Sequence, residues 1–275
     1  MMRLLASAFG LCAAGAVAAA PCVSMHEAEP PPSAAAAGLK HLAMLMLELE
    51  EGRCTAVGEV DRRHAPWSTF KIPHLLIALE TGATTPNERF VRDPARFPAE
   101  SWWSDAWREP QDPEAAFGRS TVWVYRTLTD RIADDAYRRW LQRFGYGNRD
   151  VGNGRDDFWL GGPLAVSVRE QVGFVAALVR GETGVSGSAL RALERASRQD
   201  VDFPYAVFGK TGAGPLQPGR MEGLFEGWFV GWLRDEQGAP VAAFALYATA
   251  DSFAQLAPAR RAAALSLVEV LLAAR

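Results

Sequence analysis

A serine and a lysine that could act together stand three residues apart within residues 67–73. If this segment opens a helix, Ser68 and Lys71 share one face, so the lysine nitrogen can approach the serine oxygen. A serine hydroxyl is a poor nucleophile until an adjacent base takes its proton. N–H groups near a helix N-terminus can also face a developing oxyanion. The pair therefore predicts nucleophilic catalysis by Ser68 with Lys71 as its base.

The same spacing also fits an ordinary helix start, with Ser68 as an N-cap and Lys71 in solvent. The residues that follow argue against this alternative, because Ile72 and Leu75 begin a strongly apolar helix. Pro73 falls in the first turn, where proline is tolerated. A lysine drawn into such a helix start is costly unless its pKa falls or it finds a partner.

The spacing of apolar residues changes along the chain and indicates which helices and strands position this pair. Residues 41–50 and 54–60 alternate around a turn at Gly52 and predict an antiparallel hairpin. Residues 84–118 are polar, aromatic and Pro-rich, which is typical of an irregular, pocket-lining segment. Helices are predicted within residues 71–80, 120–144, 159–180, 188–198 and 257–274, and strands over 206–212, 228–233 and 241–247.

Together these elements predict an α/β (α+β) fold. Its antiparallel sheet is made of both chain ends, and a helical lobe is inserted between them. Ser167 followed by Glu170 predicts a capping box at the start of one of the lobe helices.

The N-terminus has the features of a secretory signal. Arg3 precedes an apolar run that ends in small residues, so a signal peptide over residues 1–20 is expected, cut after Ala18 or Ala20. Such a signal predicts a secreted or periplasmic protein with no stable membrane partner. A lipid anchor on an N-terminal cysteine is the alternative.

The residues after the expected signal divide into two parts. Residues 21–38 are rich in proline and alanine and show no periodicity, so they are interpreted as a disordered linker. Residues 39–275 are then interpreted as one catalytic domain. Whether Cys22 and Cys54 pair does not follow from the sequence.

The composition limits the range of functions. The chain has 275 residues, 49% of them hydrophobic, which is enough for one large domain or two interleaved lobes. Its net charge of −3 gives no electrostatic basis for nucleic-acid binding. The four histidines lack the spacing of a metal site, so no metal is expected. The choice between a monomer and a dimer stays open.

A set of motifs in order carries a resemblance to a known family. The motifs are Ser68-Thr69-Phe70-Lys71-Ile72-Pro73, Ser120-Thr121-Val122, Tyr146-Gly147-Asn148, Phe158-Trp159-Leu160, Gly209-Lys210-Thr211-Gly212-Ala213 and Gly227-Trp228-Phe229-Val230-Gly231-Trp232. With these motifs the chain resembles the class D (oxacillinase-type) serine β-lactamases, and the likeness covers nearly the whole chain after the expected signal. The resemblance implies the penicillin-binding/serine β-lactamase fold, with the site between the lobes and a β-lactam antibiotic as substrate.

The resemblance also implies roles for individual residues. Ser68 would be acylated, and Lys71 would carry a carbamate made from its neutral amine and carbon dioxide, with no other cofactor. That carbamate would be the general base. Trp159 would donate its indole N–H to the carbamate, although from the residues alone it fits a core position. Val122 would help to keep the pocket dry, and Ser120 would relay a proton to the leaving nitrogen.

The remaining implied residues bind substrate. The strand residues Lys210, Thr211, Gly212 and Ala213 would line the site; the first two would hold the substrate carboxylate, and the Ala213 N–H would join that of Ser68 in the oxyanion hole. Arg260 would also bind the carboxylate, with the adjacent Arg261 as the alternative. Trp107 would either line the substrate groove or simply pack.

Two other activities compete with this interpretation. A D-alanyl-D-alanine peptidase usually carries Ser-x-Asn at the second motif, whereas this chain has Val122 there. The β-lactam sensor domain of a receptor is similar to class D enzymes, but it acylates and barely turns over. Continuous hydrolysis would separate an enzyme from such a sensor.

Overall fold

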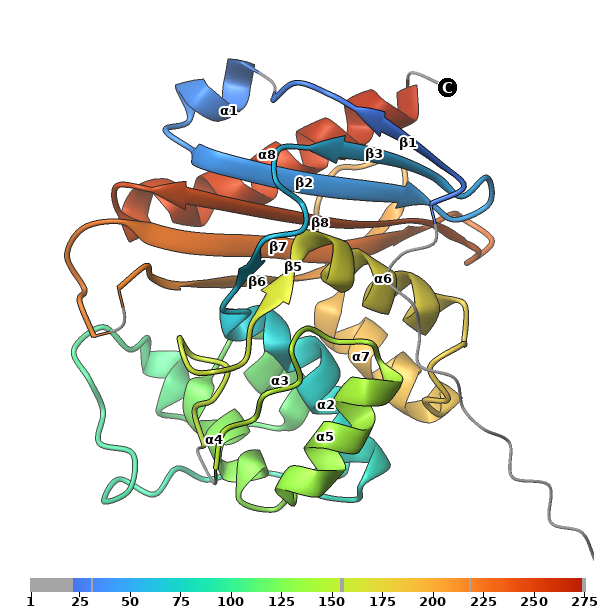
Figure 1. Ribbon diagram of the computed structural model, residues 1–275. Helices are drawn as coiled ribbons and strands as arrows, with labels where there is room; N and C mark the ends of the chain where they lie inside the picture. The colour runs from blue at the N-terminus through green and yellow to red at the C-terminus, as the bar shows by residue number, and fades with distance from the viewer. Residues whose placement is uncertain (1–21, 31, 154–155, 218, 274–275) are drawn as a thin grey trace, which may run out of the picture.

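The computed structural model describes residues 22–30, 32–153, 156–217 and 219–273. Within these residues, six strands form one sheet, and a helical lobe lies below the sheet in Figure 1. The strand order is β1 (Ser24–Glu27), β3 (Arg53–Val57), β2 (Lys40–Glu48), β8 (Pro240–Ala250), β7 (Phe225–Arg234) and β6 (Ala206–Pro215). Two short strands, β4 (Arg63–His64) and β5 (Val166–Ser167), pair where the chain passes between sheet and lobe. The predicted α/β fold with an inserted helical lobe is confirmed.

Both ends of the chain build the sheet. β2 (Lys40–Glu48) and β3 (Arg53–Val57) form the predicted hairpin. β2 also pairs with β8 (Pro240–Ala250), β8 with β7 (Phe225–Arg234), and β7 with β6 (Ala206–Pro215), all antiparallel. β6 is thus the outer strand on the side of the sheet nearest the serine–lysine segment.

Alternation along the strands decides which side chains meet the lobe. Trp228 and Val230 of β7 belong to a core shared with the helical lobe, whereas Phe229 packs in a second core with the C-terminal helix. Lys210 and Gly212 of β6 lie opposite Val230 and Trp228, so they face the lobe as well. The alternation along β6 therefore places the Lys210 side chain on the face of the sheet that meets the helical lobe.

Helices cover both faces of the sheet. α8 (Phe253–Ala273) lies along one face, and α6 (Val168–Val179) packs on the other between sheet and lobe (Figure 1). α6 starts with the predicted capping box: Ser167 accepts from the Glu170 N–H, and the Glu170 carboxylate accepts from the Ser167 N–H. Among the described residues, no helix is long and apolar enough to cross a bilayer.

The lobe is formed by the middle of the chain. Its helices are η1 (Trp67–Phe70), α2 (Lys71–Glu80), α3 (Pro113–Gly118), α4 (Val122–Thr129), α5 (Asp134–Arg143) and α7 (Gly187–Ser197). The predicted irregular segment over residues 84–118 contains α3 and the short η2 (Asp105–Trp107), which the sequence did not indicate. α3 is short and begins at a proline, so its periodicity was too brief to detect.

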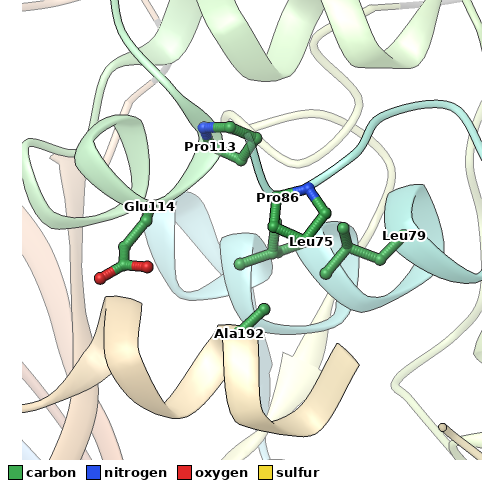
Figure 2. Close-up of a pocket in the computed structure, with 6 residues that line it drawn as sticks. All are labelled: Leu75, Leu79, Pro86, Pro113, Glu114 and Ala192. Carbon is green, nitrogen blue, oxygen red and sulfur yellow. The ribbon is translucent and has the colours of Figure 1, made fainter. Parts of the chain in front are cut away.

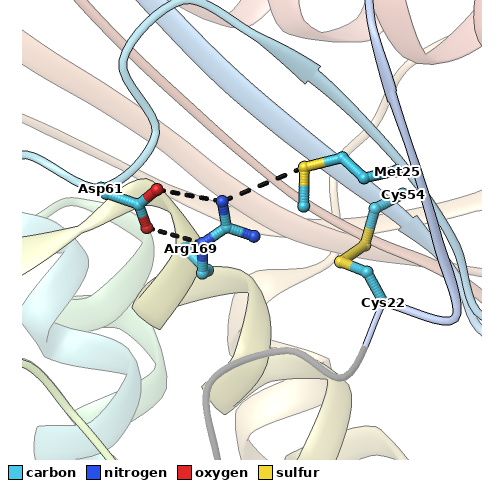
Figure 3. The surroundings of a disulfide bond; sticks show 5 residues. All are labelled: Cys22, Met25, Cys54, Asp61 and Arg169. Atoms are coloured by element: carbon cyan, nitrogen blue, oxygen red, sulfur yellow. Dashed lines mark hydrogen bonds and ion pairs between the residues drawn. A yellow bond between two sulfur atoms is a disulfide. The ribbon is translucent and has the colours of Figure 1, made fainter.

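The interpretation of residues 21–38 as a disordered linker is wrong over the described part of that segment. β1 (Ser24–Glu27) pairs in parallel with β3, and α1 (Pro32–Ala36) follows it. A disulfide joins Cys22 to Cys54 beside these strands (Figure 3). All four β1 side chains are exposed, so no alternation of apolar residues marks the strand in the sequence. The expected signal peptide, residues 1–20, lies outside the described residues.

Replacing both Cys22 and Cys54 with alanine should lower the free energy of unfolding by about 2–4 kcal/mol. The bond spans a sequence separation of 32, so losing it frees that length of chain in the unfolded state. Urea denaturation of the oxidised protein and of the variant measures the effect. Reduction should bring the wild type to the variant's midpoint and leave the variant unchanged. Equal midpoints before reduction would contradict the prediction.

Candidate active site

Ser68 and Lys71 meet at the start of α2. Ser68 lies in the 3-10 turn η1, and Lys71 is the first residue of the α-helix that continues it. The Lys71 Nζ donates a hydrogen bond of 2.9 Å to the Ser68 Oγ. The predicted approach of the two side chains is confirmed, while Ser68 itself lies one turn before the regular helix.

Lys71 is held in an environment that disfavours its charge. Its side chain is fully buried, and it forms no ion pair with a carboxylate of the described residues. Burial, and then the charge of Lys210, lowers the pKa of Lys71 well below its usual value. The nitrogen lies 5.1 Å from the centre of the Tyr125 ring. A lysine in this state is available as a neutral amine.

Three buried polar groups at or around His74, which follows Lys71 by one turn of α2, lack a partner among the described residues. They are the Trp159 Nε1, the His74 Nδ1 and the Tyr125 hydroxyl. The His74 ring lies 5.1 Å from both the Trp159 ring and the Tyr125 ring, and its Nε2 is 2.6 Å from the Tyr137 hydroxyl. Unpartnered buried polar groups are costly, so their gathering around His74, one turn after Lys71, marks a place suited to a further hydrogen-bonding group.

Ser120 stands on a constrained turn between α3 and α4. Its backbone φ is +61°, a left-handed conformation that non-glycine residues adopt uncommonly. The buried Trp107 donates from Nε1 to the Arg119 carbonyl at 2.9 Å and so fixes the residue before this turn. Val122 begins α4 and is half-buried. In the described residues, no hydrogen bond joins the Ser120 hydroxyl to Ser68 or Lys71.

β6 passes close to the nucleophile because of a glycine. A Cβ on Gly212 would lie 2.8 Å from the Pro66 carbonyl oxygen and 3.1 Å from the Ser68 nitrogen. Only glycine lets the strand come so near to η1. The half-buried Thr211 and Ala213 flank this glycine. The strand thus brings its backbone and the neighbouring Lys210 to the Ser68 turn.

Two further cations are buried at this strand. Lys210 is 5% exposed, and burial, followed by the charge of Arg260, lowers its pKa to about 7. Arg260 of α8 is 7% exposed, and burial, followed by the charge of Arg261, lowers its pKa to about 10. The Arg260 Nε and Nη1 have no partner among the described residues, whereas Arg261 is exposed. Buried, unneutralised cations in one region are suited to an anionic ligand.

Other residues at the site did not emerge from the sequence. Trp67 precedes the nucleophile and donates from its indole to the buried carboxylate of Glu226, 2.7 Å away. His74 and Tyr125 contribute two of the unpartnered groups. A possible signal was the lone acidic residue, Glu226, within the apolar strand β7.

Two hollows elsewhere in the described part of the protein hold none of these groups. One small pocket lies between α2, α3 and α7 and is lined by Leu75, Leu79, Pro86, Pro113, Glu114 and Ala192 (Figure 2). Its only charged group, the Glu114 carboxylate, pairs with Arg195 at 3.2 Å. A groove beside β1 contains Asp61 and Arg169, which pair with each other (Figure 3). Neither offers a nucleophile.

Comparisons with known proteins show which family the chain is similar to. A family model described as penicillin binding protein transpeptidase domain matches residues 53–265. Beta-lactamase OXA-2 of Salmonella typhimurium is 33% identical over 184 residues, which cover 65% of this chain and 60% of that protein. The match thus spans less than two thirds of that relative's length.

Solved structures share the fold. The crystal structure titled Beta Lactamase Class D YbXI, from Nostoc, is 26% identical with a TM-score of 0.74, over 84% of this chain and 93% of that chain. The C-terminal domain of the Bacillus licheniformis BlaR penicillin-receptor has a TM-score of 0.79 and 24% identity, over 90% of this chain and 96% of that domain. At 24% identity, the similarity to the BlaR domain shows a shared fold and nothing more.

Proposed function

This chain belongs to the penicillin-binding protein transpeptidase domain family, and we propose that it is a class D β-lactamase that hydrolyses its substrate through an acyl-enzyme on Ser68. The observation that carries the proposal is the contact of 2.9 Å between Lys71 Nζ and Ser68 Oγ. The resemblance in the motifs and the similarity to OXA-2 support a β-lactam as the substrate.

In acylation, the Ser68 oxygen attacks the carbonyl carbon of the β-lactam ring while Lys71 accepts the hydroxyl proton. The backbone N–H groups of Ser68 and Ala213 stabilise the resulting oxyanion. The carbon–nitrogen bond of the ring then breaks. The proton held by Lys71 passes through the Ser120 hydroxyl to the leaving nitrogen, so Lys71 is neutral again, Ser120 keeps its own proton, and the product is an ester on Ser68.

In deacylation, a water molecule attacks the ester carbonyl while Lys71 accepts its proton. The ester bond breaks, Ser68 recovers its proton, and the opened antibiotic leaves as a carboxylic acid. We assign Lys71 as the base in both steps because its Nζ is the hydrogen-bond partner of the Ser68 hydroxyl in the described site and its pKa is depressed.

Lys71 fits the modification that the family resemblance implies. When formed, a carbamate on this lysine supplies an anionic general base. Lys71 is buried with a depressed pKa, which favours the neutral amine that carbon dioxide requires. The Trp159 Nε1 is buried without a partner among the described residues, and its ring lies 5.7 Å from the ring of Phe70, the residue before Lys71, so we assign it as the hydrogen-bond donor to the carbamate. The nearby charge of Lys210 would also stabilise a negative charge on this residue.

Replacing Trp159 with phenylalanine should therefore reduce retention of labelled carbon dioxide on Lys71. The change removes the indole donor but keeps an aromatic ring against Phe70 and His74. Activity should fall in acidic, bicarbonate-depleted buffer and recover partly on adding bicarbonate. NMR of the labelled carbonyl carbon provides the direct measurement.

Trp232→Phe is the matched control, because the Trp232 Nε1 is also buried and unpartnered but stacks on Phe208 in the sheet. This variant should retain the label like the wild type. Full activity without label or bicarbonate would show that Lys71 acts as a plain amine.

We assign the substrate carboxylate to Lys210, Thr211 and Arg260. Arg260→Ala should raise KM by roughly 10- to 100-fold, as expected from the loss of one charge-assisted hydrogen bond. kcat should change less if the contact is equal in the ground and transition states. Arg261→Ala is the control, because that side chain is exposed and contacts Gln199. A larger effect in Arg261→Ala would reverse the assignment.

A penicillin receptor domain is the second candidate, because the fold is shared with the BlaR domain. A receptor consumes one equivalent of β-lactam and stops, whereas an enzyme continues. A chromogenic cephalosporin in large excess separates the two: sustained hydrolysis supports the enzyme, and a single stoichiometric burst supports the receptor. No reaction at all would contradict both.

We also propose that the protein acts outside the cytoplasm, in the periplasm or as a secreted protein. The Cys22–Cys54 disulfide supports this location, because such bonds persist in oxidising compartments.

A further inference from the structure

Trp67 has an unusual backbone for a bulky residue. Its φ is +49°, in the left-handed region that large side chains adopt only when their surroundings enforce it. Trp67 directly precedes Ser68, so the peptide between them carries the N–H that the proposed mechanism places in the oxyanion hole. Rotation about the Trp67 backbone would turn that N–H and move the serine oxygen.

Three contacts hold Trp67 in place. Its backbone N–H donates to the Trp159 carbonyl at 3.1 Å. Its indole Nε1 donates to the Glu226 Oε1 at 2.7 Å. Its ring lies against Gly214 of β6, where a Cβ would come within 2.2 Å of the ring. The backbone contact alone cannot fix the side chain, so Glu226 provides the polar anchor.

Burying the Glu226 carboxylate at this position is energetically unfavourable. It is 5% exposed in a strand that is otherwise apolar up to Leu233, and no lysine or arginine of the described residues pairs with it. Its second oxygen accepts from the Tyr247 hydroxyl at 3.0 Å and lies 3.6 Å from the His64 Nδ1. A buried carboxylate costs stability unless hydrogen bonds compensate it, and both its oxygens are engaged here.

We propose that Glu226 is a positioning residue, which through the Trp67 indole fixes the strained turn that aims the Ser68 hydroxyl and N–H. The inference rests on the proposed acylation of Ser68 and adds a residue on the opposite lobe to it. The carboxylate belongs to β7, and the nucleophile belongs to η1 of the helical lobe. The hydrogen bond therefore couples the sheet to the nucleophile.

This coupling predicts which kinetic constant changes. The Glu226–Trp67 contact touches no substrate atom, so the affinity of the non-covalent complex should stay near the wild-type value. The oxyanion donors act mainly in the transition state, so the rate of acylation at saturating substrate should fall. A purely structural role would lower thermal stability without this separation.

Stopped-flow acylation by a chromogenic cephalosporin tests the proposal. Trp67→Phe keeps a ring over Gly214 and removes the donor, and Glu226→Leu removes the acceptor. Each should slow acylation by roughly 10- to 100-fold, and the double variant should be no slower than the slower single variant. Glu226→Gln keeps an acceptor oxygen and should restore most of the rate.

Tyr247→Phe is the matched control, because it removes the other hydrogen bond to Glu226 and leaves the bond to Trp67. It should lower the melting temperature while acylating at nearly the wild-type rate. An equal loss of acylation in Tyr247→Phe, additive effects of the two single variants, or a wild-type rate in Trp67→Phe would each overturn the proposal. Trp67→Phe decides the case if Glu226→Leu does not fold. An unreactive wild type would instead refute the acyl-enzyme itself.

Discussion

Replacing Ser68 with alanine should abolish both the covalent adduct and the hydrolysis of a penicillin. The Ser68 oxygen is the only protein atom that forms a covalent bond to the substrate carbon in the proposed mechanism, so its removal leaves only the binding groups and the oxyanion donors. The expected loss of kcat is at least about 10³-fold, the range in which removal of a catalytic serine usually falls. Steady-state hydrolysis and intact mass measure the two effects.

The fold should survive this change, because Ser68 is half-buried and its side chain bonds only to Lys71 among the described residues. Ser186→Ala, which removes the cap of α7, is the control: it should cost stability and keep the adduct. An adduct retained by Ser68→Ala would assign the nucleophile to another residue.

Replacing Lys71 with methionine should lower the rate of hydrolysis by about 10²–10⁴-fold, the usual contribution of a general base. Methionine has nearly the same length and is apolar, so the buried site should remain filled. Acylation and deacylation should both slow, since the same base serves both steps. Pre-steady-state kinetics separates the two. Unchanged deacylation would mean that another group activates the water.

The same variant should change the pH dependence of stability. The pKa of Lys71 in the folded protein lies below its usual 10.5, so between these two values the unfolded chain binds more protons than the folded protein. The free energy of unfolding of the wild type should therefore rise with pH across this window. Lys71→Met should lack that share of the rise, so its stability relative to the wild type should be greatest at low pH. Urea midpoints at several pH values measure the difference.

Much of the site could be predicted from the sequence because the residues concerned lie close together along the chain. The spacing of Ser68 and Lys71 on one helical turn places their side chains together, and the apolar residues after Lys71 predict its burial. The capping box at Ser167 and the strands of the C-terminal half follow from residue type and period in the same way. The structure confirms each of these.

The sequence was less informative where position depends on residues far apart in the chain. Arg260 and Arg261 are adjacent on one helix, and only their packing against Phe253 and Gln199 separates them. The anchoring of Trp67 by Glu226 joins residues 159 apart. β1 is held by backbone pairing and a disulfide, neither of which leaves an apolar pattern. The positions of these residues therefore depend on tertiary contacts, which the periodicity of the sequence does not reveal.

Time-resolved intact mass spectrometry after mixing with excess penicillin tests the acyl-enzyme most directly. The mechanism predicts one adduct of the mass of the intact antibiotic within the first turnover, located on Ser68 by peptide mapping. The unmodified mass should return once the substrate is consumed. A mass that never changes while penicillin is hydrolysed, or an adduct on another residue, would contradict the assignment of Ser68 as the acylated nucleophile.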